Sequence, residues 1–436
     1  DPAALLAPGD SALEALAPGL PRVYPLGSRV TADGRLEIGG CDTVELAREF
    51  GTPAYVVAED DLRARARAFR AALAAEHEPG RIVFASKAFP CTAVYRVFAE
   101  EGLAADVASG GELSLALRAG FDPADIVVHG NAKSDAELQA ACGAGAGLIV
   151  VDALDEIERL AAAAASQGRQ QRVLVRVTPG VKPNTHDFIS TGQLDSKFGL
   201  PVDEARVAIE RLQALPQVEV AGLHMHIGSQ VFELEAFRRA VQELAAVGRF
   251  DVYDLGGGLG VAYTAQDRPP SIPEYVGVKL AALRAATDLA DATVLLEPGR
   301  ALVANSTVTL YTVESVKRGV STYVAVDGGM SDNLRPMLYG AVYEAALANR
   351  MEAGGEPCHV AGKHCESSDV IVRDVRLPSP RPGDLLVTPA TGAYGHAMAN
   401  NYNGVPRPPI IFCQDGDARA VVRRETFEDL AARDLD

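Results

Sequence analysis

The sequence has few positive charges for its length. Of its 436 residues, 41 are lysine or arginine and 58 are aspartate or glutamate, so the formal net charge is −17. Nucleic-acid-binding proteins usually carry a basic surface, and binding to anionic membranes also requires positive charge. Both kinds of partner are therefore disfavoured. The apolar and charged fractions, 48% and 23%, are typical of an ordinary globular protein.

Long hydrophobic segments are also missing. No stretch approaches the roughly 20 consecutive apolar residues that a membrane-spanning helix requires. Residues 1–6 contain neither the basic segment nor the long apolar segment of a secretory signal peptide. We therefore expect a cytoplasmic protein without a membrane anchor.

Cysteine is scarce and scattered. The six cysteines contain no CxxC pair, and they stand at positions 41, 91, 142, 358, 365 and 413. This spacing argues against a disulfide framework and against a zinc site of the usual pattern. We expect reduced thiols, most of them buried, and no bound metal.

A regular alternation of two kinds of segment fills residues 81–300. Eight short apolar runs alternate with longer segments of helical composition, and the runs lie at 81–86, 103–107, 125–129, 148–152, 173–177, 220–226, 252–255 and 294–297. Apolar strands joined by helices are typical of parallel sheets. Because there are eight runs, we expect a closed TIM-like (β/α)8 barrel rather than an open doubly wound sheet.

The pattern changes after residue 300. Six strand-like runs follow with few helical segments between them, at 307–313, 322–326, 369–375, 384–387, 410–412 and 418–422. This indicates an all-β sandwich or small barrel, which the poorly periodic N-terminal segment is expected to join. The sequence thus predicts an α/β protein whose N-terminal segment, barrel and C-terminal β domain occupy residues 1–50, 51–305 and 306–436.

Catalytic groups of such barrels lie at the C-terminal ends of the strands, so the residues there are the best candidates for a site. Lys87 follows the first strand, where partial desolvation would lower its pKa and make its amine a nucleophile. A lysine at the rim of the barrel is the simpler alternative. Glu297 and Arg300 follow the eighth strand, where they suit a ring nitrogen and an oxyanion, or form a surface salt bridge.

Two further strand ends indicate a flat, phosphorylated ligand. Alternation along the sixth strand places His224 and His226 on one side, but no third zinc ligand is evident, so stacking of an imidazole on a planar ring is the better interpretation. Three glycines at 256–258 follow the seventh strand, where backbone amides can approach a phosphate or simply form a flexible turn. With Lys87 and Glu297, these residues predict a pyridoxal 5′-phosphate (PLP) site, because PLP needs an amine, a phosphate cradle and an acid opposite its pyridine nitrogen.

Motifs along nearly the whole chain resemble the fold-type III PLP-dependent decarboxylases, specifically the diaminopimelate decarboxylase family. In chain order they are FASKA at 84–88, DVASGGEL at 106–113, TG at 191–192, SKFG at 196–199, HMHIGSQ at 224–230, EPGR at 297–300, DGGM at 327–330, NLRP at 333–336, LY at 338–339, CES at 365–367, GAY at 392–394 and NYN at 401–403. The resemblance implies an alanine racemase-like fold and a carboxy-lyase. Its reaction would be decarboxylation of meso-2,6-diaminopimelate at the D-centre to L-lysine and CO2, the last step of bacterial lysine biosynthesis.

The resemblance also implies roles for individual residues. Lys87 is expected to bind PLP as a Schiff base, and His226 to stack on the cofactor ring. Other cofactor contacts are expected from Asp106, Ser229, Gly258, Glu297, Gly299, Arg300 and Tyr394. Contacts with the substrate, chiefly with its retained carboxylate, are expected from Arg300, Arg335, Tyr339 and Tyr394.

Cys365 and Glu366 resemble a pair that reaches the site from a second subunit. On that interpretation Cys365 gives a proton to the carbon that has lost CO2, and Glu366 binds the distant amino group. Neighbouring groups can tune the pKa of a cysteine, about 8.5, to such a task. The enzyme would then be at least a homodimer with shared active sites.

Several alternatives stay within the same fold. The chain departs from the family pattern at residues 362–364, at Ala301 and at residues 395–399, and these changes bear on substrate preference. A decarboxylase of ornithine, lysine, arginine, a carboxylated polyamine or a carrier-bound amino acid is the main alternative. Ornithine-type enzymes commonly carry aspartate at the position of Glu366, and Arg335 fits a second carboxylate. An alanine racemase would use a tyrosine where this chain has Cys365, and a non-catalytic PLP carrier is typically a single barrel.

Overall fold

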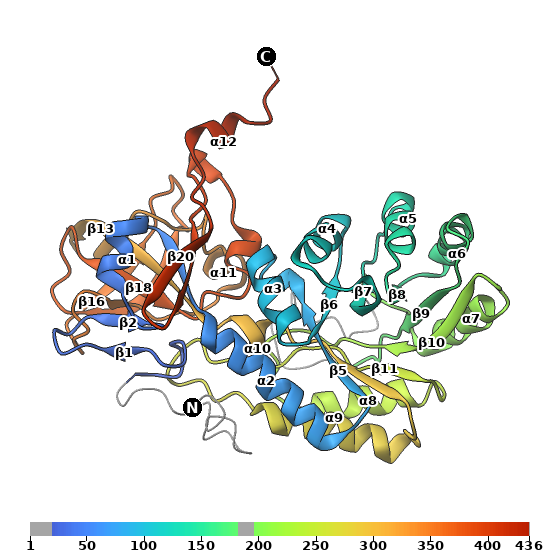
Figure 1. Ribbon diagram of the computed structural model, residues 1–436. Coiled ribbons are helices and arrows are strands. Elements are labelled where there is room, and N and C mark those ends of the chain that lie inside the picture. The colour runs from blue at the N-terminus through green and yellow to red at the C-terminus, as the bar shows by residue number, and fades with distance from the viewer. Residues whose placement is uncertain (1–19, 182–195, 436) are drawn as a thin grey trace. The chain divides into compact units, whose positions relative to one another are not determined.

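The computed structural model describes residues 20–181 and 196–435. The TG motif at 191–192 and residues 1–6 lie outside these ranges. The chain forms two compact units (Figure 1). One comprises Arg65–Gly260 and Pro269–Ala301, and the other comprises Asp1–Ala64, Val261–Arg268 and Leu302–Asp436.

The first unit is a closed barrel of eight parallel strands, as the eight apolar runs predict. The strands are β5 (Gly80–Ala85), β6 (Ala104–Val107), β7 (Ile126–Val128), β8 (Leu148–Val151), β9 (Gln171–Arg176), β10 (Val218–His224), β11 (Val252–Asp254) and β12 (Thr293–Leu296). Neighbours in the sequence pair in parallel, and β12 pairs with β5 to close the barrel. Small and branched side chains fill its interior, among them Val83, Val127, Leu174 and Leu295.

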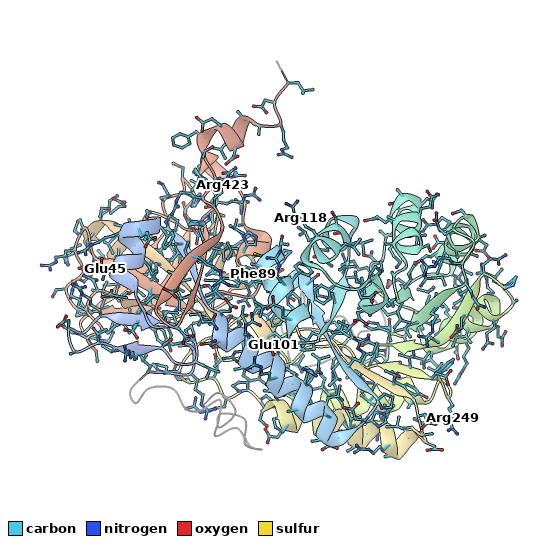
Figure 2. The ribbon with its side chains drawn as sticks, viewed as in Figure 1. Glu45, Phe89, Glu101, Arg118, Arg249 and Arg423 are labelled. Atoms are coloured by element: carbon cyan, nitrogen blue, oxygen red, sulfur yellow. The ribbon has the colours of Figure 1, made fainter. Side chains whose placement is uncertain are left out.

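Helices connect successive strands and lie outside the barrel (Figure 1). They are α3 (Thr92–Glu100), α4 (Gly110–Ala119), α5 (Asp135–Ala144), α6 (Ile157–Ser166), α7 (Val202–Gln213), α8 (Leu234–Ala245) and α9 (Ile272–Ala286), with α2 (Glu59–Glu76) preceding β5. Local signals set their starts: in α5 and in α9 a serine and a glutamate three residues later form reciprocal capping bonds. Charged side chains such as Arg118 and Arg249 point away from the barrel and are exposed (Figure 2).

The second unit is built on a nine-stranded sheet. Its strands are β4 (Ala54–Ala58), β13 (Thr307–Arg318), β14 (Thr322–Val326), β15 (Ala346–Leu347), β16 (Glu356–Ala361), β17 (Val370–Leu377), β18 (Leu385–Pro389), β19 (Ile410–Gln414) and β20 (Asp417–Val422). The long strand β13 pairs with β4, β14 and β18. The six predicted runs are all strands, whereas β16 was not predicted. Only Cys358 and Val360 of this strand are buried, so it contains no continuous apolar run, and it is held by pairing with β14 and β17.

The N-terminal part of this unit adds a small sheet of β1 (Arg29–Val30), β2 (Leu36–Ile38) and β3 (Cys41–Asp42), followed by α1 (Thr43–Phe50). The unit extends to Ala64, further than the boundary expected at residue 50. The reason is that β4 pairs with β13 and β19, and that Asp61 accepts a hydrogen bond from Leu26 N at 2.7 Å. Residues 261–268 also belong here, since Asn305 Nδ2 donates to Ala262 O at 2.8 Å.

Short helices complete the unit, namely α10 (Arg300–Val303), which begins at the end of the barrel unit, α11 (Arg335–Tyr339) and α12 (Phe427–Ala431). Within the described ranges, every helix is too short or too polar to cross a membrane.

Candidate functional site

Buried ionisable side chains gather at the C-terminal ends of the barrel strands. Each is carried by a different strand or by the residue directly after one: Asp106 of β6, His129 after β7, Arg176 of β9, His224 of β10, Asp254 of β11 and Glu297 after β12. All of them are less than a tenth exposed. Because parallel strands of a barrel end on the same side, residues far apart in sequence share one face of the fold.

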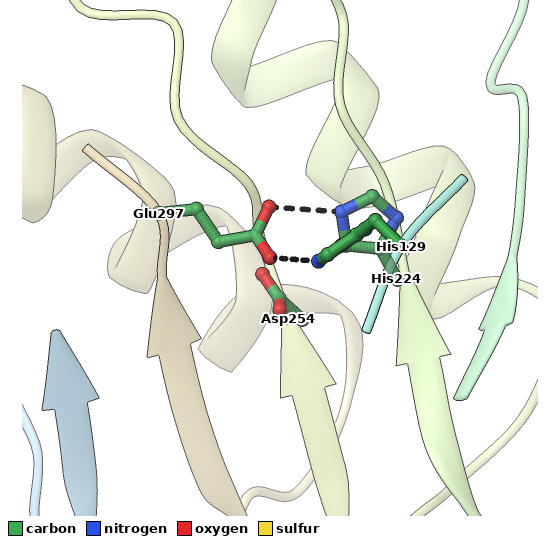
Figure 3. Close-up of side chains that lie close together, drawn as sticks. All are labelled: His129, His224, Asp254 and Glu297. Carbon is green, nitrogen blue, oxygen red and sulfur yellow. Dashed lines mark hydrogen bonds and ion pairs between the residues drawn. The ribbon is translucent and has the colours of Figure 1, made fainter. Parts of the chain in front are cut away.

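The carboxylate of Glu297 faces both His129 and His224 (Figure 3). Its Oε2 is 3.0 Å from His224 Nε2, and its Oε1 is 2.6 Å from His129 Nε2. The two imidazole rings meet edge to face, with centroids 4.7 Å apart. One buried carboxylate therefore has two imidazole partners.

These contacts decide which groups carry charge. Burial alone would raise the pKa of Glu297, but His129 and His224 hold it well below its ordinary value. Burial also opposes a charge on His129, yet Asp106 and Glu297 raise the pKa of this histidine. Burial lowers the pKa of His224 to about 3. Near neutral pH Glu297 is thus ionised and His224 is neutral, while the neighbouring carboxylates favour the protonated form of His129.

The two aspartates of the cluster behave differently from Glu297. Burial and the nearby Glu297 raise the pKa of Asp254 well above its ordinary value, and Asp254 Oδ1 accepts a hydrogen bond from Gly256 N at 2.9 Å. Burial raises the pKa of Asp106 to about 6, against the opposing charge of His129. The pKa values of the two aspartates are thus raised while that of Glu297 is lowered, and such divergence within one cluster is common in active sites.

The cluster contains two potential metal ligands that the sequence analysis did not single out, and the expectation of no bound metal stays a prediction. Near His224 no third metal ligand was evident, but His129, His224, Asp254 and Glu297 offer ligand atoms that all lie within 4.8 Å of one another. Such a set could hold a metal ion or the protonated nitrogen of a ring. Sequence reasoning missed the contribution of His129 and Asp254, although each stands at a strand end, which is the signal that identified Glu297.

Lys87 lies on a 3-10 turn, Ser86–Ala88, directly after β5. Its neighbours Ser86 and Ala88 are buried, but Lys87 itself is exposed. The partial desolvation expected of this amine therefore stays a prediction. The charge of Lys87 still acts on the cluster, since it contributes to lowering the pKa of Asp106 and of His226.

His226 lies two residues beyond the end of β10 and contacts the glycine-rich loop that follows β11. Gly257 N donates to His226 Nδ1 at 3.2 Å. Burial, followed by the charge of Lys87, holds the pKa of His226 well below its ordinary value. The neutral ring therefore carries its proton on Nε2, since Nδ1 acts as an acceptor.

The glycines of this loop permit close backbone packing. A Cβ atom on Gly257 would lie 2.2 Å from the carbonyl oxygen of Glu297, and Gly258 adopts a φ of +105°, which side-chain-bearing residues rarely adopt. Gly299 also packs closely, since its Cβ would meet Ala85 O at 2.9 Å. Close packing of the backbone therefore requires glycine at these positions, and the binding of a phosphate by this loop stays a prediction.

Ser229 and Arg300 lie together beside this loop. Arg300 donates to Ser229 Oγ from Nε at 3.1 Å and from Nη2 at 2.9 Å. Arg300 is buried and Ser229 is half-buried. A hydroxyl and a guanidinium held in this way can bind an anion such as a phosphate.

The other predicted residues belong to the second unit. Arg335 begins α11 and is buried, with its guanidinium carbon 4.5 Å from the centre of the Tyr263 ring and with Tyr343 as a hydrogen-bond partner. Tyr339 ends the same helix and is half-buried. Tyr394 is also half-buried and adopts a φ of +62°.

Cys365 and Glu366 are exposed on the loop between β16 and β17. Asp369, at the end of this loop, anchors it: the Asp369 Oδ2 accepts a hydrogen bond from His364 N at 3.0 Å and lies 2.7 Å from His364 Nδ1. Cys365 N donates to Asn403 Oδ1 at 2.8 Å. The departure from the family pattern at 362–364 thus builds a buried histidine–aspartate pair, which holds the backbone of the exposed pair.

Three comparisons with known proteins add to this geometry. The family description "Pyridoxal-dependent decarboxylase, pyridoxal binding domain" matches residues 59–304. Diaminopimelate decarboxylase of Actinosynnema pretiosum subsp. auranticum is 48% identical over 427 residues, which cover 95% of each chain. The enzyme of the same name from Bacillus subtilis strain 168 is 44% identical over 429 residues, 94% of this chain and 97% of the relative. Among solved structures, diaminopimelate decarboxylase from M. jannaschii in co-complex with L-lysine has a TM-score of 0.89 and 33% identity, and covers 94% of this chain and 98% of that chain.

Proposed function

The chain belongs to the diaminopimelate decarboxylases, and from this membership we propose that it decarboxylates meso-2,6-diaminopimelate to L-lysine and CO2 with PLP as its cofactor. The observation that carries the proposal is the buried, ionised Glu297 in the same barrel as Lys87 and a glycine cradle. An amine, an acid and a phosphate cradle at one end of a barrel are the groups that PLP requires.

The barrel residues fit the cofactor. Lys87 would bind its aldehyde carbon, and Glu297 would face the pyridine nitrogen and keep a proton there. His226 would stack on the ring, with Asp106 supporting the same site. The phosphate would lie among Ser229, Gly258, Gly299, Arg300 and Tyr394. When bound, PLP supplies a conjugated ring that accepts the electron pair left on the α-carbon as CO2 departs.

Residues of the second unit would recognise the substrate. Arg335 and Tyr339, together with Arg300, would bind the carboxylate that is retained, and Tyr394 would lie close by. Glu366 would bind the distal ammonium group, and substrates without that charge would be rejected because a desolvated carboxylate would be left unpaired. Cys365 would hold the proton that is delivered to the carbon from which CO2 has left.

The first test measures CO2 release from the purified protein with added PLP. We expect turnover of meso-diaminopimelate and little turnover of L-ornithine, L-lysine or L-arginine. Preference for one of these simpler amino acids, which lack the second carboxylate, would contradict the assignment of Arg335 and Tyr339. Treatment with borohydride should also fix the cofactor covalently on Lys87, and a Lys87→Ala variant should lose this mass increase.

We further propose a homodimer in which Cys365 and Glu366 serve the active site of the partner subunit. Their exposure in a single chain and the anchoring of their loop by His364 and Asp369 support this arrangement. Mixing two inactive homodimers, Lys87→Ala and Cys365→Ala, tests it. A shared site restores about a quarter of the activity, because half of the dimers are mixed and each mixed dimer has one intact site. Sites built within single chains restore none.

The protein is proposed to act in the cytoplasm. All six cysteines are free, and five of them are buried. Free thiols are expected in a reducing compartment, whereas secreted proteins tend to pair them.

A further inference from the structure

A second lysine of the barrel, Lys279, is completely buried, although none of the sequence motifs contains it. It lies on α9, which starts at the capping box of Ser271 and Glu274. Its Nζ donates to three consecutive backbone carbonyls, those of Leu255 at 2.7 Å, Gly256 at 3.2 Å and Gly257 at 3.2 Å. These carbonyls belong to the glycine-rich loop after β11, so an ammonium group stands directly behind the cradle.

Two of these three carbonyls have another donor, and among the described residues only Leu255 O depends on Lys279 alone. Gly256 O also accepts from Glu297 N at 3.0 Å, and Gly257 O accepts from the hydroxyl of Tyr275 at 2.9 Å. Tyr275 lies one turn before Lys279 on the same helix, and the two side chains are 2.6 Å apart. A buried ammonium is costly to desolvate, and a neutral donor such as an amide could serve Leu255 O, so the presence of a lysine here points to a further role.

The loop itself supplies that explanation. In a peptide unit the N–H points opposite to the C=O, so carbonyls that face Lys279 direct the following amides to the other side of the loop. Gly256 N is bonded to Asp254 and Gly257 N to His226. Among the residues that the structure describes, Gly258 N has no hydrogen-bond acceptor. One free amide therefore faces away from Lys279, as a donor for an anion.

The charges around Lys279 are consistent with an anion on the far side of the loop. Burial lowers the pKa of Lys279 to about 7, while Asp254 and Glu297 act in the opposite direction. The rings of Tyr275 and Phe237 lie 4.2 Å and 4.8 Å from its Nζ. A phosphate bound at Gly258 would favour the ammonium form further, because opposite charges stabilise each other across a low-dielectric loop.

We propose that Lys279 is a positioning residue for the cofactor phosphate: it orients the amides of the 256–258 loop and places a buried positive charge behind them. Lys279 touches neither the cofactor nor the substrate and acts through the loop. This inference rests on the proposed PLP site. It adds a second cation to Arg300.

The test compares the affinity of the apoenzyme for PLP with its affinity for pyridoxal, which lacks the phosphate. Both are measured by equilibrium dialysis and by the visible absorbance of the bound ligand, for wild type and for Lys279→Met. We expect Lys279→Met to weaken PLP binding by about tenfold or more while pyridoxal binding changes by less than about twofold. Lys279→Gln, which retains hydrogen-bond donors but no charge, should show the same selective loss if Lys279→Met does not fold.

Lys133 offers a matched control. It is a buried lysine of the same unit that donates to the carbonyls of Gly130 and Val150, but it is paired with Glu156 at 2.9 Å. Lys133→Met should lower the melting temperature without changing the ratio of PLP to pyridoxal affinity. Equal losses of PLP and pyridoxal affinity in the Lys279 variants would show a purely structural role and overturn the inference. Failure of the wild type to bind PLP would instead refute the proposed function.

Discussion

Replacing Glu297 by glutamine tests the centre of the site. The substitution keeps the size of the side chain and removes its negative charge. The wild-type carboxylate faces His224 Nε2 at 3.0 Å and His129 Nε2 at 2.6 Å, one through each oxygen. A glutamine amide has one oxygen and one NH2 group, so it can accept from only one of the two histidines. The charge that raises the pKa of His129 is also lost.

The expected magnitude follows from these contacts. A hydrogen bond to a charged group contributes about 1.5–3 kcal/mol. If Glu297 holds the proton on the pyridine nitrogen of PLP, the loss of one such bond in the transition state lowers kcat by about 10- to 150-fold. Leaving one imidazole opposite an amide donor costs a further amount of about 1–3 kcal/mol in the free energy of unfolding.

The assay measures kcat for meso-diaminopimelate, PLP affinity and the urea-unfolding free energy for Glu297→Gln and Glu297→Asp. Glu297→Asp keeps the charge and should retain more activity than Glu297→Gln. Glu219→Gln is the control, because Glu219 is exposed and pairs with Arg172 at 3.1 Å on the surface, so kcat of this variant should stay within about twofold of wild type. If Glu297→Gln keeps wild-type kcat in a folded, PLP-loaded protein, an ionised acid opposite the ring nitrogen is not needed and the reasoning fails.

Three further predictions concern packing and protonation. Gly257→Ala should weaken PLP binding by about tenfold or more, because the added Cβ would lie 2.2 Å from the carbonyl oxygen of Glu297. Gly277→Ala on α9 is the control: the nearest atom to its added Cβ is 3.7 Å away, and the substitution should raise the unfolding free energy by about 0.5–1 kcal/mol. The pKa of His224 is about 3 in the folded protein and 6.5 ordinarily. Between these two pH values the unfolded chain binds a proton that the folded chain does not. The free energy of unfolding should therefore fall by at most about 5 kcal/mol as the pH drops from 6.5 to about 3. Unfolding measured between pH 7 and 4 should show a shallower loss for His224→Gln than for wild type. Asp369→Asn should cost about 1–3 kcal/mol in unfolding experiments, because it weakens the hydrogen bonds to the buried His364. Asp374→Asn in β17, which begins one residue after Asp369, should change stability by less than about 0.5 kcal/mol, because the Asp374 side chain is 88% exposed. Equal effects would contradict the anchoring role.

The sequence by itself determined the barrel and the positions of its functional strand ends. All eight predicted runs are the barrel strands, because a strand buried on both faces must be apolar along its whole length, and this is a local property. The end of each run could therefore be read directly, and Lys87, His226 and Glu297 were found in this way. The family motifs added Cys365 and Arg335, which composition and periodicity do not single out.

Tertiary structure decided which of these groups meet and what charge they carry. His129, His224 and Glu297 converge from β7, β10 and β12, and only barrel closure brings them within hydrogen-bonding distance. Their protonation depends on burial and on mutual charge, neither of which a single segment of sequence contains.

Long-range pairing decided the remaining features. Strand β4 belongs to the second unit because its partners, β13 and β19, lie more than two hundred residues away in the sequence. Lys279 reaches the glycine-rich loop from the following helix, where nothing in the local sequence distinguishes it from a solvated helix lysine. In both cases the partner is selected by packing in three dimensions, whereas the sequence pattern records only the preference of each segment for helix or strand.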